Sequence, residues 1–153
     1  MREDLDRLSE SMQRYWENLA EEANEEIFPE VRSVLEALRE KGIELGVLSS
    51  RTVTTSKKSL EKHSIRDYFR YVISPQTARA PKSKKSPEMW QFALRQIGAR
   101  AEEVLHVDDD YETGIVGATE AGIRAVLIDR SGKSTSTFDC IVIGNLAEVL
   151  ELV

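Results

Sequence analysis

The sequence contains a single cysteine and no long apolar run. Cys140 has no second cysteine for an intrachain disulfide, and its place in the apolar run 140–143 predicts a small core residue. A lone thiol of this kind suits the reducing cytosol. No apolar run approaches the roughly 18 residues of a membrane-spanning helix, and no signal-peptide pattern is present. We therefore expect a cytoplasmic protein with no membrane partner.

Positive charge is also scarce. The 21 Lys and Arg residues are outnumbered by 27 Asp and Glu residues, which gives a net charge of −6 and a pI near 5.1. This balance argues against nucleic acid as a partner, because a general nucleic-acid binder needs an excess of positive charge. At 153 residues, without internal repeats or low-complexity segments, the chain fits one domain that can bury a real core.

The first residues predict a helix with one apolar face. Residues 4–24 are rich in Glu, Arg, Leu and Ala and contain no Gly or Pro. This face can pack on the chain's own core, form a homodimer seam through residues 4–20, or contact a partner chain. We therefore divide the chain into an N-terminal helical segment, residues 1–27, and a core, residues 28–153. The apolar residues recur at alternating spacings of three and four: Leu5, Leu8, Met12, Tyr15 and Leu19.

From residue 28 onward, helical and strand patterns alternate. Pro29 suits the first position of a helix that ends at Gly42, and Ser86 with Pro87 begins another that ends at Gly98. Strands that alternate with helices predict an α/β fold, a doubly wound parallel sheet with helices on both faces. The apolar runs predict five strands, at residues 43–48, 71–74, 103–107, 124–128 and 140–143.

Three adjacent carboxylates follow the third predicted strand. Asp108, Asp109 and Asp110 lie between the run ending at Val107 and a helical pattern that Gly122 ends. In a parallel sheet this turn lies at the carboxyl edge, where such folds bind ligands. Oxygen-ligated Mg²⁺ would relieve the repulsion among the three charges. The alternative is a solvated acidic turn that complements a helix dipole.

Two other polar segments lie next to predicted strands or helices. Ser49, Ser50 and Arg51 directly follow the strand at residues 43–48. The irregular stretch 75–86 carries four basic residues and almost nothing apolar, so it is either a solvated loop or a loop that faces an anion. Its basic residues are Arg79, Lys82, Lys84 and Lys85.

In their order and spacing, these segments resemble the haloacid dehalogenase superfamily. The stretches FPEVRSVLEALREKGIELGVLSS and KSKKSPEMWQFALRQIGARAEEVLHVDDD carry the resemblance, which covers residues 28–153. The Ser-Arg-Thr after the first strand and the paired acids Asp109 and Asp110 are similar to the magnesium-dependent phosphatase branch. The resemblance implies that Ser49, Ser50 and Lys84 contact a phosphoryl group, with Ser49 and Lys84 assisting catalysis. It assigns Mg²⁺ to Asp109, with Asp110 and Asp108 as further ligands.

The sequence departs from that family in two places. The family's nucleophile is the first aspartate of an Asp-x-Asp motif that ends a strand, whereas the Asp-Leu-Asp at residues 4–6 follows no apolar run and opens a helix. Gly114 stands where the family often has another acid, and Asp108 where it often has glycine. The N-terminal helix resembles the last helix of a family cap insertion.

These departures shape the function that we expect from the sequence. The resemblance implies a phosphohydrolase-type domain that binds a small phosphorylated molecule and weakly binds Mg²⁺, without aspartyl-phosphate turnover on its own. The alternatives are a non-catalytic structural or regulatory module, or one half of a two-chain phosphatase. A receiver domain fits less well, because its paired acids would follow the first strand.

The predicted strand order is 71–74, 43–48, 103–107, 124–128, 140–143. The family places its nucleophile strand between the strands at residues 43–48 and 103–107. Without that strand, open central edges would leave backbone groups unpaired, at about 1–3 kcal/mol for each buried group. We therefore predict that residues 43–48 pair directly with residues 103–107.

Overall fold

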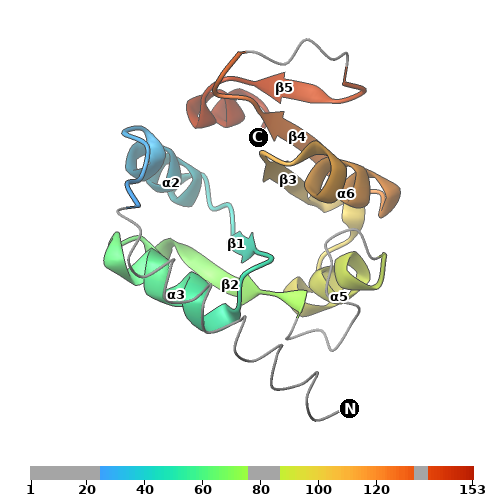
Figure 1. Cartoon of the computed structure of the whole chain (residues 1–153), viewed down its shortest axis with the longest axis horizontal. Helices are drawn as coiled ribbons and strands as arrows, with labels where there is room; N and C mark the ends of the chain where they lie inside the picture. Colours follow the sequence, from blue (N-terminus) through green and yellow to red (C-terminus); the bar gives the residue numbers. More distant parts are fainter. Residues whose placement is uncertain (1–24, 76–86, 133–137) are drawn as a thin grey trace, which may run out of the picture.

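The computed structural model describes residues 25–75, 87–132 and 138–153 (Figure 1). The predicted helix and dimer seam at residues 4–24 lie outside the described residues, as do most of the basic stretch and Lys84. The helices and strands, in order, are α2 (Val31–Glu40), β1 (Leu45–Leu48), α3 (Val53–Lys62), η1 (Arg66–Tyr68), β2 (Phe69–Ile73), α5 (Pro87–Ile97), η2 (Ala101–Glu103), β3 (Leu105–Asp108), η3 (Tyr111–Ile115), α6 (Val116–Glu120), β4 (Arg124–Ile128), β5 (Ile141–Ile143) and η4 (Leu146–Glu151).

The α/β fold class is confirmed. In α2, Val34 and Leu38 recur at helical spacing and are buried, and Gly42 with φ +75° follows the helix end as predicted. Thr52 caps α3, since its side chain accepts a hydrogen bond from Thr55 N at 3.0 Å. The strands are slightly displaced from their predicted bounds. Within the described parts of the chain, no helix is long and apolar enough to cross a membrane.

All five strands run in the same direction. β1 pairs in parallel with β2, and β4 pairs in parallel with both β3 and β5. Glu30 at the start of α2 accepts a hydrogen bond from Leu146 N of η4 at 3.4 Å, and Lys41 at the end of α2 donates to Val153 O at 2.8 Å. These contacts set α2 and η4 side by side in one direction. In an α/β fold each helix runs opposite to the strand that it is joined to. Since α2 leads into β1, η4 follows β5, and α2 and η4 run in the same direction, β1 also runs parallel to β5.

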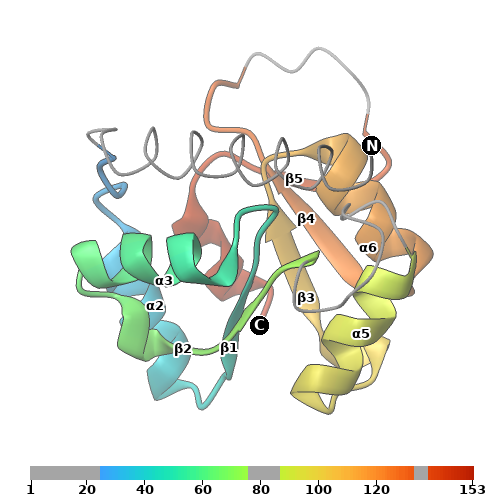
Figure 2. The same cartoon turned by 60° about the horizontal axis from the view of Figure 1, so that its bottom comes forward.

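Helices cover both faces of the sheet. Val126 of β4 packs with Val34 of α2 and Val149 of η4. Its neighbours in β4, Ala125 and Leu127, point to the other face and pack with Trp90 of α5 and with the η3–α6 helix. Figure 2 shows the helices on either side of the strands. Cys140, predicted as a small core residue, is only half-buried and packs against the border of the cluster around Trp90.

The predicted direct pairing of β1 with β3 is wrong. The strands form two sheets, β1-β2 and β3-β4-β5, and no described strand joins them. The other predicted neighbours do pair. The reason lies in the helices: α2 packs on residues of both sheets, and Leu48 of β1 touches the clusters around Trp90 and Met89 of α5. Closing the gap would force these large side chains together, and overpacking of that kind is itself destabilising.

The helix after the acidic turn differs in type from the prediction. The helix after the acidic turn begins as one π-helical turn, η3, and becomes α-helical only at Val116. Single π-turns of this kind are frequent at functional sites. The terminal element is a short 3-10 helix, η4, and Asn145 is its N-cap.

Candidate functional site

Polar residues gather at the carboxyl edge of the strands. Ser49 follows β1, Ser74 follows β2 and is fully buried, Asp108 ends β3, and Asp129 follows β4. Because the strands are parallel, all these positions lie at one edge of the two sheets. This is the edge at which open α/β sheets bind their ligands.

Ser49 lies in a short turn between β1 and α3. Its backbone N–H donates to Ile73 O at 3.1 Å, which extends the pairing of β1 with β2 by one residue. Its hydroxyl accepts a hydrogen bond from Arg51 N at 3.1 Å. The hydroxyl hydrogen is therefore not used by this contact and can donate to an anion. Ser50 is exposed at the same turn.

Arg51 connects this turn to the segment that precedes α2. Its guanidinium forms an ion pair with Glu25 at 2.8 Å, and Ser59 of α3 also donates to Glu25, at 3.0 Å. The hydrogen bond from Arg51 is the main reason why the pKa of Glu25 lies below its usual value, with burial acting in the opposite direction. Arg51 therefore holds the turn after β1 through its N–H, which contacts Ser49, and through its guanidinium, which contacts Glu25.

Asp108 is buried, and each of its carboxylate oxygens has a hydrogen-bonding partner. Its Oδ1 accepts from Asp110 N at 3.0 Å, and its Oδ2 lies 3.0 Å from His106 Nε2. The His106 ring meets the Trp90 ring edge-on, with 4.8 Å between centroids. Sequence reasoning missed His106, although residues two apart in a strand share a face and the i, i+2 pair with Asp108 could have revealed it.

Gly114 lies directly under the Asp108 side chain. A Cβ at position 114 would lie 2.5 Å from Asp108 Oδ2 and 2.6 Å from Asp108 Cβ, closer than real atoms approach. Gly114 is itself buried in the π-turn, and its N–H donates to Asp110 O at 2.9 Å. The carboxylate at position 108 thus occupies the space that a side chain at position 114 would need.

The other two carboxylates point elsewhere. Asp110 caps η3, with its Oδ1 accepting from Thr113 N at 2.9 Å. Asp109 is exposed, and no hydrogen bond or ion pair joins it to the described part of the chain. Among the residues described, no three His, Cys, Asp or Glu side chains converge as a metal cluster. The structure therefore places Asp108, Asp109 and Asp110 at one turn but does not bring their oxygens together.

This donor set still fits one mode of Mg²⁺ binding. Mg²⁺ prefers oxygen ligands, keeps several waters and often uses only one or two carboxylates. The exposed Asp109 can serve as such a ligand without losing any contact that holds the fold. Asp108 would have to give up its contacts with His106 or Asp110 N before it could turn outward.

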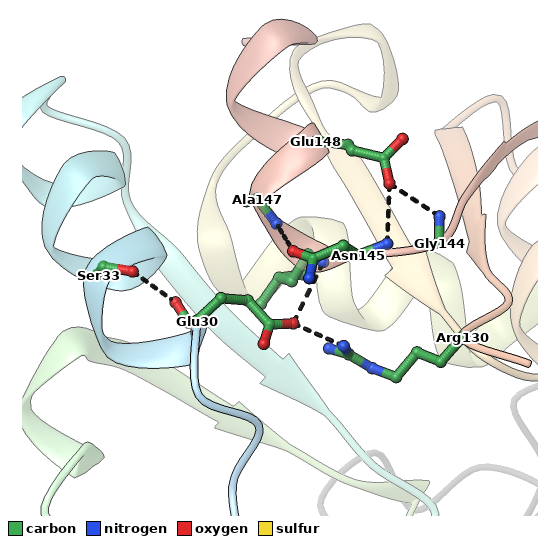
Figure 3. Close-up of polar contacts among 8 residues, drawn as sticks. Glu30, Ser33, Arg130, Gly144, Asn145, Ala147 and Glu148 are labelled. Carbon is green, nitrogen blue, oxygen red and sulfur yellow. Dashed lines mark hydrogen bonds and ion pairs between the residues drawn. The ribbon is translucent and has the colours of Figure 1, made fainter.

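A second polar cluster at this edge was not predicted. Arg130, after β4, forms an ion pair with Glu30 at 2.6 Å, and its guanidinium stacks 3.5 Å from the centroid of the Phe28 ring. Figure 3 shows Glu30 between Arg130 and the start of η4, where Asn145 and Glu148 form a capping box. This cluster joins the start of α2 to the loops after β4 and β5.

Comparison with known proteins agrees with the fold and the order of the segments. The family model described as haloacid dehalogenase-like hydrolase matches residues 2–128. The chain is 30% identical over 123 residues to a ribulose-1,5-bisphosphate 5-phosphatase of Halopiger xanaduensis, covering 80% of this chain and 50% of that protein. It is 26% identical over 132 residues to a glyceraldehyde 3-phosphate phosphatase of Methanothermobacter thermautotrophicus, covering 82% and 58%.

A solved structure shows the same arrangement. The crystal structure of a HAD phosphatase from Thermococcus onnurineus has a TM-score of 0.74 and 26% identity, and the match covers 83% of this chain and 58% of that one. The chain thus spans about half the length of the curated relatives it matches. On the extent of the family match and the shared fold, the chain belongs to the haloacid dehalogenase-like hydrolases.

Proposed function

We propose that the chain is a phosphohydrolase-type domain that binds a small phosphorylated molecule together with Mg²⁺. The observation that carries this proposal is the position of Ser49 and the acidic turn, residues 108–110, each at the carboxyl end of a strand in a parallel sheet. The similarity to two sugar-phosphate phosphatases supports the same class of ligand. The single thiol suits a cytoplasmic location.

Each site residue has a distinct role in this proposal. The Ser49 hydroxyl donates to a phosphoryl oxygen while Arg51 N holds it in place, and the exposed Ser50 provides a second donor. Lys84 balances the negative charge of the phosphoryl group. Asp109 binds the metal, with Asp110 and Asp108 beside it. Mg²⁺, when bound, would shield charge on the phosphoryl group.

The test is thermal unfolding with inorganic phosphate and Mg²⁺. A ligand that binds only the folded state raises the free energy of unfolding, by about 0.4 kcal/mol when its concentration equals Kd, and so raises the melting temperature. We expect a rise in about 10 mM Mg²⁺ and phosphate, roughly ten times a millimolar Kd. The rise should be lost in Asp109→Asn and reduced in Ser49→Ala.

Glu61→Gln is the matched control, since it removes one exposed carboxylate near the far end of α3. This variant should respond as the natural chain does. Equal responses of Asp109→Asn and the natural chain would contradict the proposal and favour a solvated acidic turn.

A second candidate is a non-catalytic interaction module. Two observations favour it: the three carboxylates do not converge, and β1 and β3 each have one edge that no described strand covers. The two candidates differ in the thermal test, because an interaction module has no reason to respond to phosphate. A response that depends on Asp109 and Ser49 would favour the phosphohydrolase-type domain.

A further inference from the structure

His106 and Asp108 form a buried pair on one face of β3. Their side chains are 14% and 7% exposed, and His106 Nε2 lies 3.0 Å from Asp108 Oδ2. Residues two apart in a strand point to the same face, so the pair needs no distortion of the backbone. An ionised carboxylate only accepts hydrogen bonds, so the hydrogen between the two groups is the one on Nε2. His106 therefore directs a donor at one oxygen of Asp108.

Trp90 of α5 packs against the imidazole ring of His106. The two rings meet edge-on, with 4.8 Å between their centroids and 80° between their planes. Trp90 is 2% exposed and belongs to the buried cluster that contains Ile115 and Ala118. Because protein interiors are close-packed, the imidazole cannot turn away from Asp108 without disturbing this cluster. The core thus fixes the direction of the Nε2 donor.

The Asp108 carboxylate also has a space into which it turns. Gly114 leaves this space, since a Cβ at position 114 would lie 2.3 Å from Asp108 Cγ. Within it, Oδ1 accepts a hydrogen bond from Asp110 N at 3.0 Å, while Oδ2 meets His106. Both oxygens therefore have partners within the fold, and the carboxylate is turned inward.

Asp109 differs from its neighbour. It is exposed, whereas Asp108 is buried. The Oδ1 atom of Asp110 is already used, because it accepts a hydrogen bond from Thr113 N at 2.9 Å. The acidic turn thus presents the carboxylate of Asp109 to solvent, and a metal ion that approaches from solvent meets this carboxylate first.

The number of carboxylates that a site offers decides how it binds a metal ion. Mg²⁺ keeps several waters and is often bound through one or two carboxylates, whereas Ca²⁺ takes more oxygen ligands from the protein. Affinity in such sites rises with the number of charged ligands. With Asp108 turned outward, the acidic turn would therefore bind both ions more tightly, and the gain would be larger for Ca²⁺.

We propose that His106 is a positioning residue that keeps Asp108 turned inward and so limits the acidic turn to one carboxylate for a metal ion. The inference rests on the proposed function, in which Asp109 binds Mg²⁺. His106 acts through Asp108 and does not touch the ion. Its effect is to favour weak, water-rich binding of Mg²⁺ over tighter binding of Ca²⁺.

The proposal fixes the sign of the effect when His106 is removed. A partner that holds a ligand in place for a metal contributes to affinity, and its loss usually weakens binding by about 10- to 100-fold. A partner that holds a carboxylate away from the metal has the opposite effect, because its loss frees a further ligand. The metal affinity of a His106 variant therefore separates the two roles without any measurement of activity.

The test is a titration with Mg²⁺ and with Ca²⁺, followed by NMR at the amides of the acidic turn. His106→Phe keeps a ring against Trp90 but removes the donor. We expect this variant to bind Mg²⁺ about tenfold more tightly than the natural chain does, and Ca²⁺ to gain by a larger factor. The carboxyl carbon of Asp108 should shift more on addition of metal in this variant than in the natural chain.

Further variants serve as controls. His106→Gln restores a donor near the place of Nε2 and should bind both ions as the natural chain does. His63→Phe removes the other histidine of the sequence, at the end of α3, and should also leave binding unchanged. Asp108→Asn added to His106→Phe should remove the gain, because the second carboxylate is then missing.

Gly114→Ala tests the inference by a second route and keeps it testable if His106→Phe does not fold. The new Cβ would displace the Asp108 carboxylate from its inward place, so this variant should also bind Mg²⁺ more tightly. Agreement between the two variants would support the role of His106, since they free the carboxylate by different means.

The outcomes separate this inference from the proposed function. If the natural chain binds Mg²⁺ and the folded variants bind it equally or more weakly, the role of His106 is overturned and the proposed function is unaffected. Binding in the variants alone would support the role of His106 and contradict the Mg²⁺ site of the natural chain. Binding in none of these proteins would overturn both.

Discussion

The Asp108 carboxylate lies over Gly114, in the space that a side chain at position 114 would occupy. The two residues are therefore coupled sterically, across the turn between β3 and η3. An acidic side chain at one position requires glycine at the other. Hydrogen bonds from Asp110 N and with His106 fix the carboxylate in this place.

Gly114→Ala should destabilise the fold. The new Cβ must displace Asp108, and overpacking of this kind costs about 1–3 kcal/mol. Asp108→Gly combined with Gly114→Ala should recover part of the loss, because the first change removes the side chain that blocks the second. Chemical unfolding of both single variants and the double variant measures the coupling. Additive effects of the two changes would contradict the steric account.

Glu30→Gln should lower the melting temperature at neutral pH. The pKa of Glu30 is held below its ordinary value of 4.5, first by its own backbone N–H and then by Arg130. A carboxyl group with a lowered folded pKa stabilises the fold at pH values above 4.5, and this contribution is lost as the pH falls through the folded pKa. The difference between Glu30→Gln and the natural chain should therefore shrink in acid.

Glu26→Gln is the control for this prediction, since Glu26 is exposed and lies in the same segment. It should melt close to the natural chain at every pH. A constant difference between Glu30→Gln and the natural chain across the acid range would show that packing, not the ionised carboxylate, is responsible.

Purified alone, the chain should not hydrolyse a generic phosphate ester in Mg²⁺. The residues described place no carboxylate on a strand between β1 and β3, and an aspartyl-phosphate route needs a nucleophile there. A colorimetric assay with p-nitrophenyl phosphate checks this expectation. Turnover that survives stringent purification and is lost in Asp109→Asn would refute it, and would indicate Asp108 or Asp110 as a base that activates water.

The predicted helix at residues 4–24 suggests a homodimer. Its five apolar residues would form a larger exposed patch than soluble monomers usually have. Light scattering at about 100 μM, well above a micromolar Kd, should show a dimer for the natural chain. Leu8→Glu with Tyr15→Glu should give a monomer. A monomeric natural chain would instead indicate that the helix packs on its own domain.

The fold was largely readable from the sequence, because local signals coincide with its elements. Gly42, Gly98 and Gly122 end helices in the sequence and, with positive φ, in the structure. The separation of β1 from β3 was not readable, since it depends on how helices pack across both sheets. The Glu30–Arg130 pair joins residues 100 positions apart, and no local pattern indicates such a contact.

The site was predicted only in part, for a related reason. The sequence places Ser49 and the three aspartates at one edge of the sheet, but it does not fix their side-chain directions. Asp108 turns inward because Gly114 leaves room and His106 provides a partner. Asp110 turns to the N–H of Thr113, as a capping residue does.

The most direct test of the proposed site is an NMR titration with Mg²⁺, followed by inorganic phosphate. We expect amide shifts at Asp109, Asp110 and Thr113 to saturate at millimolar Mg²⁺, and shifts at Ser49 and Ser50 to follow when phosphate is added. Asp109→Asn should abolish the first set and weaken the second. Unchanged spectra at about 10 mM of both ions, roughly ten times the expected Kd, would contradict the account.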